Sequence, residues 1–316
     1  MSAHESSMAT VPPGRARLAR RVAELFPELS YTRAKRAVEG GQVTVDGERV
    51  ADAGAWVAPA QRVTWDRNLP VERLVEGPAV ELVHVDADLT VAVKPAGLLT
   101  QPTPAREKDT LLARVSTALA RRRSAGAPRV FVSVVHRLDK ETSGLVAFAL
   151  SRKGLESLRA QLEDHSMERV YEALVEGELE RDSGTFDRAL IGDGTHRRRW
   201  VARPNERGKA AVTHWEVVKR FAGATHVRVR LETGRTHQIR IHFASAGHPV
   251  IGERVYRPIR MEDAEFEAPR QMLHAGEIAF THPATGTRVL LTTPPPADFS
   301  AALASLPRAR RGKVQS

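Results

Sequence analysis

A polar segment of nine residues, 136–144, lies between two short apolar runs, 130–135 and 145–150. Runs of this length that are rich in Val and Phe and end at polar residues or Gly are typical of buried strands. A loop between two rigid strands can hold a side chain in a fixed position. Its one aspartate, Asp139, stands among basic residues. The segment therefore indicates either an ordinary polar turn or a functional site built around this carboxylate.

The composition indicates a globular protein with an anionic partner. The chain has 316 residues, 41% of them hydrophobic, which is enough for one large domain and a small one. It carries 48 basic and 38 acidic residues, a net charge of +10. This surplus favours RNA or DNA as a partner, although the abundance of Arg and Ala also fits a bias in genome composition.

Several classes of protein are disfavoured. The absence of cysteine excludes disulfides, thiol catalysis and cysteine zinc sites. Residues 1–14 lack the apolar core of a signal peptide, and no apolar run approaches the roughly 20 residues of a membrane span. We therefore expect a cytoplasmic protein with no membrane partner.

Residues 15–65 have the pattern of a small α+β module. Apolar residues recur at helical spacing over 18–25, and a second helix is expected from 31 to the glycine pair at 40–41. The alternating residues 43–45, followed by Asp46-Gly47, predict a hairpin.

Residues 78–305 are expected to form the larger domain. Asp109 is placed to cap the first of its helices. Many strands with few helices predict an α+β fold on a mostly antiparallel, mixed sheet. We expect strands over 80–85, 90–93, 169–175, 211–219, 227–231 and 277–280, and helices over 109–119 and 151–163. The remaining segments are predicted to be a disordered N-terminus (1–14), a linker (66–77) and a basic disordered tail (306–316).

The loop 136–144, His-Arg-Leu-Asp-x-x-Thr-Ser-Gly, resembles the catalytic signature of the RluA-type family of RNA pseudouridine synthases. Residues 15–65 resemble the S4 RNA-binding module. Other family segments are matched in the same order by 94–97, 169–173, 233–240 with 247–249, and 273–275 with 280–283. Two departures are Arg169, where the family commonly has Lys, and Glu253, where it commonly has Asp. The resemblance implies the pseudouridine synthase fold.

The resemblance also implies a reaction. The C1′–N1 bond of a uridine breaks, the uracil turns, and C1′ rejoins it at C5, so neither a cofactor nor a metal is required. Asp139 would either attack C1′ or remove the C2′ proton, and both routes stay open. A buried carboxylate stays ionised only beside a cation, and Arg235 is the residue that the resemblance suggests. Tyr171 would stack on the base and could assist removal of the C5 proton.

We expect RNA as the partner, ribosomal rather than transfer RNA, and a monomeric protein. His237, His242, His248 and His274 could suggest a metal site, but no carboxylate stands at ligand spacing among them, so no metal is expected. The candidate RNA-binding residues are His136, Arg137, Lys140, Thr142, Lys94, Gln238, Arg240, His274, Arg33 and Arg36.

Two other functions are compatible with parts of the pattern. A non-catalytic RNA-binding or ribosome-assembly factor would use the same scaffold, although it would not need Asp139, Tyr171 and Arg235 together. A glycosidase could use Asp139 and Glu141, but only 5% of the residues are aromatic, which is few for stacking on sugars. The modified uridine is not evident from the sequence, and the combined pattern favours an RNA-modifying isomerase.

Overall fold

The computed structural model describes residues 14–67, 77–105, 107–122, 130–192, 199–203, 205–257 and 266–308. Most of the segments predicted as N-terminus, linker and tail lie outside these residues. The chain divides into two compact units, one of 1–81 with 99–133 and the other of 82–98 with 134–316. The segment 99–133, assigned above to the larger domain, therefore groups with the N-terminal residues.

The first unit contains the two helices and the hairpin expected from the sequence. Apolar residues of α1 and α2 pack with β2, and Ser30 caps α2 by accepting from the Arg33 N–H. Asp46 and Gly47 both have positive φ, as a tight hairpin turn requires. The elements are β1 (Ala16–Arg17), α1 (Leu18–Leu25), α2 (Tyr31–Glu39), β2 (Val43–Val45), β3 (Glu48–Arg49), β4 (Trp56–Val57), β5 (Val63–Trp65) and α3 (Leu111–Arg121).

The N-cap of α3 differs from the prediction. Thr110 accepts a hydrogen bond from the Ala113 N–H, whereas Asp109 binds the side chain of Arg114. The hydroxyl of Thr110 is one residue closer to the first turn of α3 than the Asp109 carboxylate is. The Asp109 carboxylate pairs with the Arg114 guanidinium instead.

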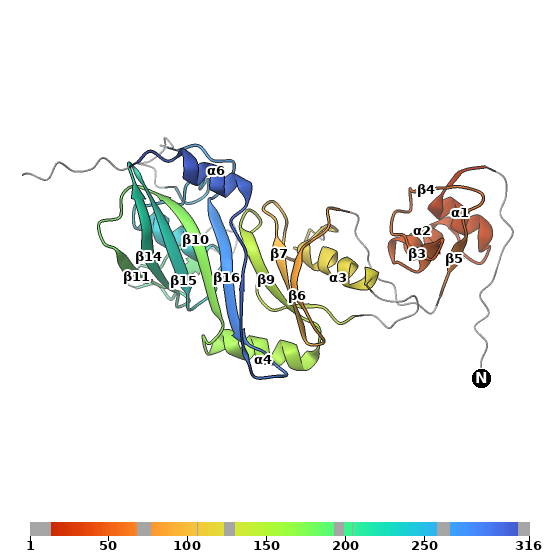
Figure 1. Cartoon of the computed structure of the whole chain (residues 1–316), viewed down its shortest axis with the longest axis horizontal. Helices are drawn as coiled ribbons and strands as arrows, with labels where there is room; N and C mark the ends of the chain where they lie inside the picture. Colours follow the sequence, from red (N-terminus) through yellow and green to blue (C-terminus); the bar gives the residue numbers. More distant parts are fainter. Residues whose placement is uncertain are drawn as a thin grey trace, which may run out of the picture. The chain divides into compact units, whose positions relative to one another are not determined.

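The second unit is built on a ten-stranded sheet, with strands side by side in the order β11-β14-β15-β10-β16-β9-β7-β6 (Figure 1). In addition, β17 pairs with β16 and β8 with β9. The strands are β6 (Leu82–Val85), β7 (Leu89–Lys94), β8 (Ser133–Val134), β9 (Ser143–Ala149), β10 (Glu168–Glu176), β11 (Ser183–Asp187), β14 (Val212–Phe221), β15 (Ala224–Leu231), β16 (Leu273–Thr281) and β17 (Arg288–Thr292). A separate pair is formed by β12 (Leu190–Gly192) and β13 (Arg199–Val201).

From β11 to β6, neighbouring strands of this sheet are antiparallel except at one place. There β9 runs parallel to β16, with Ser143 opposite His274 and Gly144 opposite Ala275. This confirms the predicted mixed, mostly antiparallel sheet. The run 130–135 is a strand only at Ser133–Val134, so most of that predicted strand is an irregular lead into the loop.

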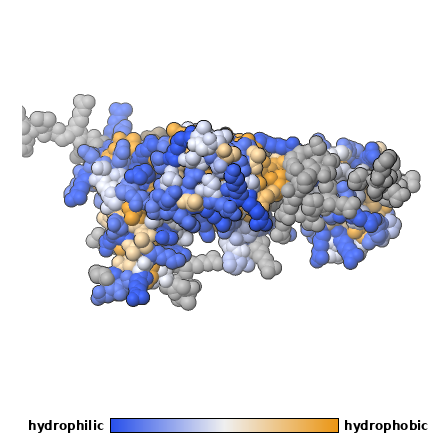
Figure 2. Space-filling view, turned by 90° about the horizontal axis from the view of Figure 1, so that it is seen from below, coloured by the Kyte–Doolittle hydropathy of each residue, from blue (hydrophilic) through white to orange (hydrophobic). Residues whose placement is uncertain are grey.

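Helices α4 (Arg152–Glu163), α5 (Gln238–Ser245) and α6 (Ala297–Ser305) complete the second unit. Leu158 of α4 packs on β7, β9 and β16, and Phe299 of α6 packs against Leu174 and Phe221. Hydrophilic residues cover most of the face of this unit seen in Figure 2. None of the helices in the described segments has the length and apolar content of a transmembrane span.

Candidate active site

The loop that carries Asp139 is fixed by its backbone. Thr142 N–H donates to the Asp139 carbonyl at 3.1 Å and closes a turn. Gly144 follows with φ of +120°, and a Cβ there would lie 2.2 Å from the Ala275 carbonyl oxygen. Only glycine fits this close parallel contact between β9 and β16, so the Ser-Gly that ends the loop has a steric cause.

Lys94, the last residue of β7, holds the same loop in place by hydrogen bonds. Its fully buried ammonium donates to the carbonyls of Pro95, Leu98 and Lys140 at 2.9, 2.7 and 2.8 Å. Because all three N–H groups are used within the protein, none is left for a phosphate. The prediction that Lys94 contacts RNA is therefore wrong. Lys94 instead positions the loop.

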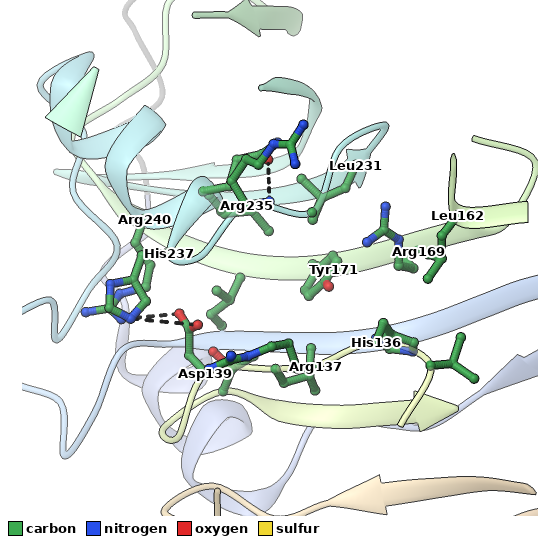
Figure 3. A pocket seen from close by; sticks show the side chains of 17 residues that line it. His136, Arg137, Asp139, Leu162, Arg169, Tyr171, Leu231, Arg235, His237 and Arg240 are labelled. Carbon is green, nitrogen blue, oxygen red and sulfur yellow. Dashed lines mark hydrogen bonds and ion pairs between the residues drawn. The ribbon is translucent and has the colours of Figure 1, made fainter. Parts of the chain in front are cut away.

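Asp139 faces Arg240 across a pocket (Figure 3). Its Oδ2 accepts a hydrogen bond from Nη1 of Arg240 at 3.2 Å, and its Oδ1 lies 3.8 Å from Nε2 of His237. The Asp139 side chain is 18% exposed, so its charge is partly removed from water. The cation paired with this carboxylate is therefore Arg240.

Arg240 is itself held by a second carboxylate, Glu253. Nε and Nη2 of Arg240 donate to the two oxygens of Glu253 at 2.6 and 2.8 Å, a bidentate pair. Burial raises the pKa of the Glu253 carboxyl, but the hydrogen bonds and charge of Arg240 outweigh it and hold that pKa below its usual value. Both ions are therefore charged, and the guanidinium has one edge fixed and Nη1 free for Asp139. The role of Glu253 was missed, although its place as the departure from the family's Asp was a signal.

Arg235, the expected partner of Asp139, lies elsewhere. It is exposed, its Nε donates to the Ala210 carbonyl at 2.9 Å, and its side chain points away from Asp139 in Figure 3. His237, in the left-handed conformation with φ of +60°, starts α5, and the helix carries Arg240 inward. The predicted ion pair between Asp139 and Arg235 is thus wrong. Helix α5 begins after Arg235, so Arg235 stays outside the helix while Arg240 is carried to Asp139.

Tyr171 lines the same pocket from β10 and is 5% exposed. Burial raises the pKa of its hydroxyl, and nearby Asp139 raises it further, against the charge of Arg169. The hydroxyl is therefore protonated at neutral pH and is a poor base. The position suits stacking on a planar ligand.

His237 connects Asp139 to Tyr256. Its Nδ1 lies 2.6 Å from the Tyr256 hydroxyl, and the two rings meet edge to face. Burial lowers the pKa of His237 despite the attraction of Asp139, so the ring is neutral at pH 7. Tyr256 was also missed as a site residue, because it lies 19 residues beyond His237 in the sequence.

The pocket has a volume of about 290 Å³, near the lower end for ligand pockets. Its lining includes Arg137 and Arg235, both exposed, beside the buried Tyr171 and Arg240. The arrangement combines a carboxylate paired with a cation, a small pocket that contains an aromatic ring, and exposed cations that can contact a polyanion.

The candidate RNA-binding residues separate by burial. Gln238 and His274 are 2% and 1% exposed, and the polar atoms of both side chains form hydrogen bonds with other protein groups. The prediction that these two residues contact RNA directly is therefore wrong. The buried members are His136, Thr142, Lys94, Gln238, Arg240 and His274, and the exposed members are Arg33, Arg36, Arg137 and Lys140.

Among the described residues, one group of side chains, His84, Asp86 and His282, is close enough to hold a metal ion. Nε2 of both histidines lies 2.5–2.8 Å from Oδ2 of Asp86, and Nδ1 of His282 accepts from the N–H groups of Ala284 and Thr285. Nδ1 therefore holds the lone pair and Nε2 the proton, the reverse of what a metal at Nε2 requires. The three side chains form hydrogen bonds that connect Asp86, between β6 and β7, to His282, which directly follows β16.

Two family models match the chain. The model described as RNA pseudouridylate synthase matches residues 88–245, and the S4 domain model matches residues 16–63. The first match includes Asp139 and both side chains that lie next to it, His237 and Arg240.

Curated relatives are similar over most of their length. The ribosomal large subunit pseudouridine synthase D of Pseudomonas aeruginosa is 36% identical over 90% of each chain. The enzyme of the same name from Nitrosomonas europaea is 34% identical over 94% of this chain and 87% of its own. The dual-specificity RNA pseudouridine synthase RluA of Pasteurella multocida is 36% identical over 69% of this chain and 94% of its own.

Solved structures share the fold. Human RNA pseudouridylate synthase domain containing 1 has a TM-score of 0.56 at 21% identity, covering 75% of this chain and 100% of its own. Domain containing 4 has a TM-score of 0.58 at 20% identity, covering 71% and 91%.

Proposed function

The chain belongs to the family of RNA pseudouridylate synthases, isomerases of uridine in RNA, and we propose that it modifies large-subunit ribosomal RNA with Asp139 as the catalytic carboxylate. The proposed substrate is supported by the relatives named ribosomal large subunit pseudouridine synthase D and by the S4 domain. The observation that carries the proposed role of Asp139 is its ion pair with Arg240 inside the pocket.

Asp139 acts at the ribose. It attacks C1′ or removes the C2′ proton, and in either route the C1′–N1 bond breaks with its electron pair going to the uracil. The uracil turns and C5 bonds to C1′. In the first route this breaks the ester bond between Asp139 and C1′, and in the second the protonated Asp139 returns its proton to C2′. The C5 proton then leaves to solvent, and N1 gains a proton. No oxidant, reductant or second substrate enters the balance. Arg240 binds and orients Asp139 for this step, and Glu253 keeps Arg240 in place.

The other pocket residues bind the extruded nucleotide. Tyr171 stacks on the uracil, whose removal from the RNA stack costs a few kcal/mol. Arg137 and Arg235, exposed on the pocket lining, contact the neighbouring phosphates. Arg235 thereby contributes to RNA affinity while Arg240 serves the chemistry.

Pseudouridine mapping tests this proposal in cells. Large-subunit ribosomal RNA is compared between cells that lack the gene and the same cells supplied with the wild-type chain or with Asp139→Asn. The wild type restores one or more pseudouridines and the variant restores none. Restoration by Asp139→Asn would contradict the role of the carboxylate, and a change confined to transfer RNA would contradict the substrate.

A further inference from the structure

Two buried N–H groups, on residues that line the pocket, are unsatisfied within the part of the chain that the structure describes. They are Nδ1 of His136 and Nε of Arg169. The two residues are 8% and 7% exposed. Buried donors without an acceptor are rare in folded proteins, and a pair of them on residues of one pocket suits the acceptor atom of a bound ligand.

The hydrogen bonds of His136 determine which of its nitrogens carries the proton. Nε2 accepts from the Ala147 N–H of β9 at 3.1 Å. Burial, with a further contribution from Arg169, lowers the pKa of His136 to about 3, so the ring is neutral at pH 7. The single ring proton therefore stands on Nδ1, which is a donor without an acceptor.

Arg169 presents the second donor from β10. Its Nη2 donates to the Glu232 carbonyl at 3.2 Å, which anchors one edge of the guanidinium. Gly234 leaves room for the other edge, because a Cβ there would be 2.6 Å from Nη1. Nε–H of an arginine is a donor at any physiological pH, so this group also requires an acceptor.

Figure 3 shows how these donors lie relative to the carboxylate. Asp139 is at one end of the row of side chains, His136 and Arg169 are at the other, and Tyr171 lies between them. A uracil that stacks on Tyr171 with its N1 toward Asp139 directs the opposite corner of the ring toward the two donors. That corner is C4 with its carbonyl oxygen, whose two lone pairs can accept two hydrogen bonds.

We propose that His136 Nδ1–H and Arg169 Nε–H bind the O4 oxygen of the target uracil and so select uracil against cytosine. This inference rests on the proposed function and specifies how its site recognises the base. Cytosine carries an amino group at C4, which would place donors against donors and leave both protein groups unsatisfied.

The same pair of donors also fits the product. A half-turn of uracil about its N3–C6 axis exchanges N1 with C5 and, at the same time, C4 with C2. When C5 faces the ribose, the opposite corner is therefore C2 with its own carbonyl oxygen. The two donors therefore face a carbonyl oxygen both before and after the uracil rotates. They do not need to move during the reaction, so both side chains can be buried and fixed.

Binding of RNAs that differ only at the modified position tests the inference. Wild-type tritium release first identifies a short RNA that is modified, and absence of any release would overturn both the proposed function and this inference. Unreactive versions then carry pseudouridine or cytidine at that position. Wild type should bind the pseudouridine RNA roughly 100-fold more tightly than the cytidine RNA.

His136→Phe should reduce this preference about tenfold, because it keeps a ring and removes the donor. Arg169→Lys, which keeps the cation and removes Nε–H, should reduce it in the same direction if the phenylalanine variant does not fold. His226→Phe, a buried histidine of β15 outside the pocket lining, is the matched control and should leave it unchanged. An unchanged preference in a folded His136 or Arg169 variant, or an equal loss in the control, would overturn the proposal.

Discussion

Arg240 binds two carboxylates with one guanidinium. Its Nε and Nη2 bind Glu253, and its Nη1 binds Asp139. The side chains of Arg240 and Glu253 are 7% and 0% exposed, so neither charge is stable without the other. Asp139 therefore meets a cation whose position is already fixed before RNA arrives.

The two arginines of this segment give a matched test. Arg240→Lys keeps a charge but cannot span both carboxylates, so kcat should fall about 100-fold or more. Arg235→Lys keeps an exposed charge and should leave kcat close to wild type. Steady-state kinetics of tritium release checks both variants, and a larger loss of kcat at Arg235 would return it to the catalytic role first expected from the sequence.

Glu253 should make stability depend on pH. Its folded pKa is lowered from 4.5, so its stabilising contribution is complete above the unfolded pKa and is lost as the pH falls through the folded pKa. Glu253→Gln should therefore destabilise the protein at pH 7, and the difference from wild type should shrink below about pH 4.5. Urea denaturation at several pH values measures this, and a difference that grows in acid would refute the ion pair.

At the scale of the element, α5 decides which residues face the site. All but the last of its residues, Gln238–Ser245, are buried, so it has no amphipathic pattern from which a helix could be predicted. Strands β6, β7, β9, β10, β14 and β15 and helix α4 were predictable because their apolar residues form short runs, alternate or recur on one face, whereas β11, β12, β13 and β17 were not predicted. The partner of Asp139 could not be predicted, since three-dimensional placement of Arg235 and Arg240 depends on where α5 begins.

The start of α5 is a left-handed residue, His237. This conformation costs an L-residue roughly 1–2 kcal/mol, and glycine adopts it freely. His237→Gly should thus be more stable than His237→Ala by about 1 kcal/mol, since both lack the ring. Thermal or chemical denaturation compares them, and equal stability would mean that α5 begins in a different conformation.

At the scale of the whole molecule, we expect positive charge and the S4 domain to bring RNA to the enzyme. The net charge is +10, and Arg33 and Arg36 are exposed on α2 of that domain. The module's helices and hairpin were predicted from capping and turn residues, whereas its contacts with RNA stay a prediction.

Substitution of both arginines by Gln should weaken RNA binding and leave kcat at saturating RNA unchanged. The log–log dependence of affinity on salt should become shallower by about 0.7 for each lost phosphate contact on a single strand. Lys35→Gln in the same helix, also exposed, offers a comparison for a general charge effect. If the double variant binds RNA with unchanged affinity, Arg33 and Arg36 do not contact RNA.

The central claim is that Asp139, paired with Arg240, carries out the isomerisation. The most direct test is tritium release at pH 7 from large-subunit ribosomal RNA transcripts labelled at uracil C5, with no metal added. The wild-type protein should release tritium in proportion to the pseudouridine formed, and folded Asp139→Asn should release none above background. Release by Asp139→Asn at a rate near that of wild type would contradict the account.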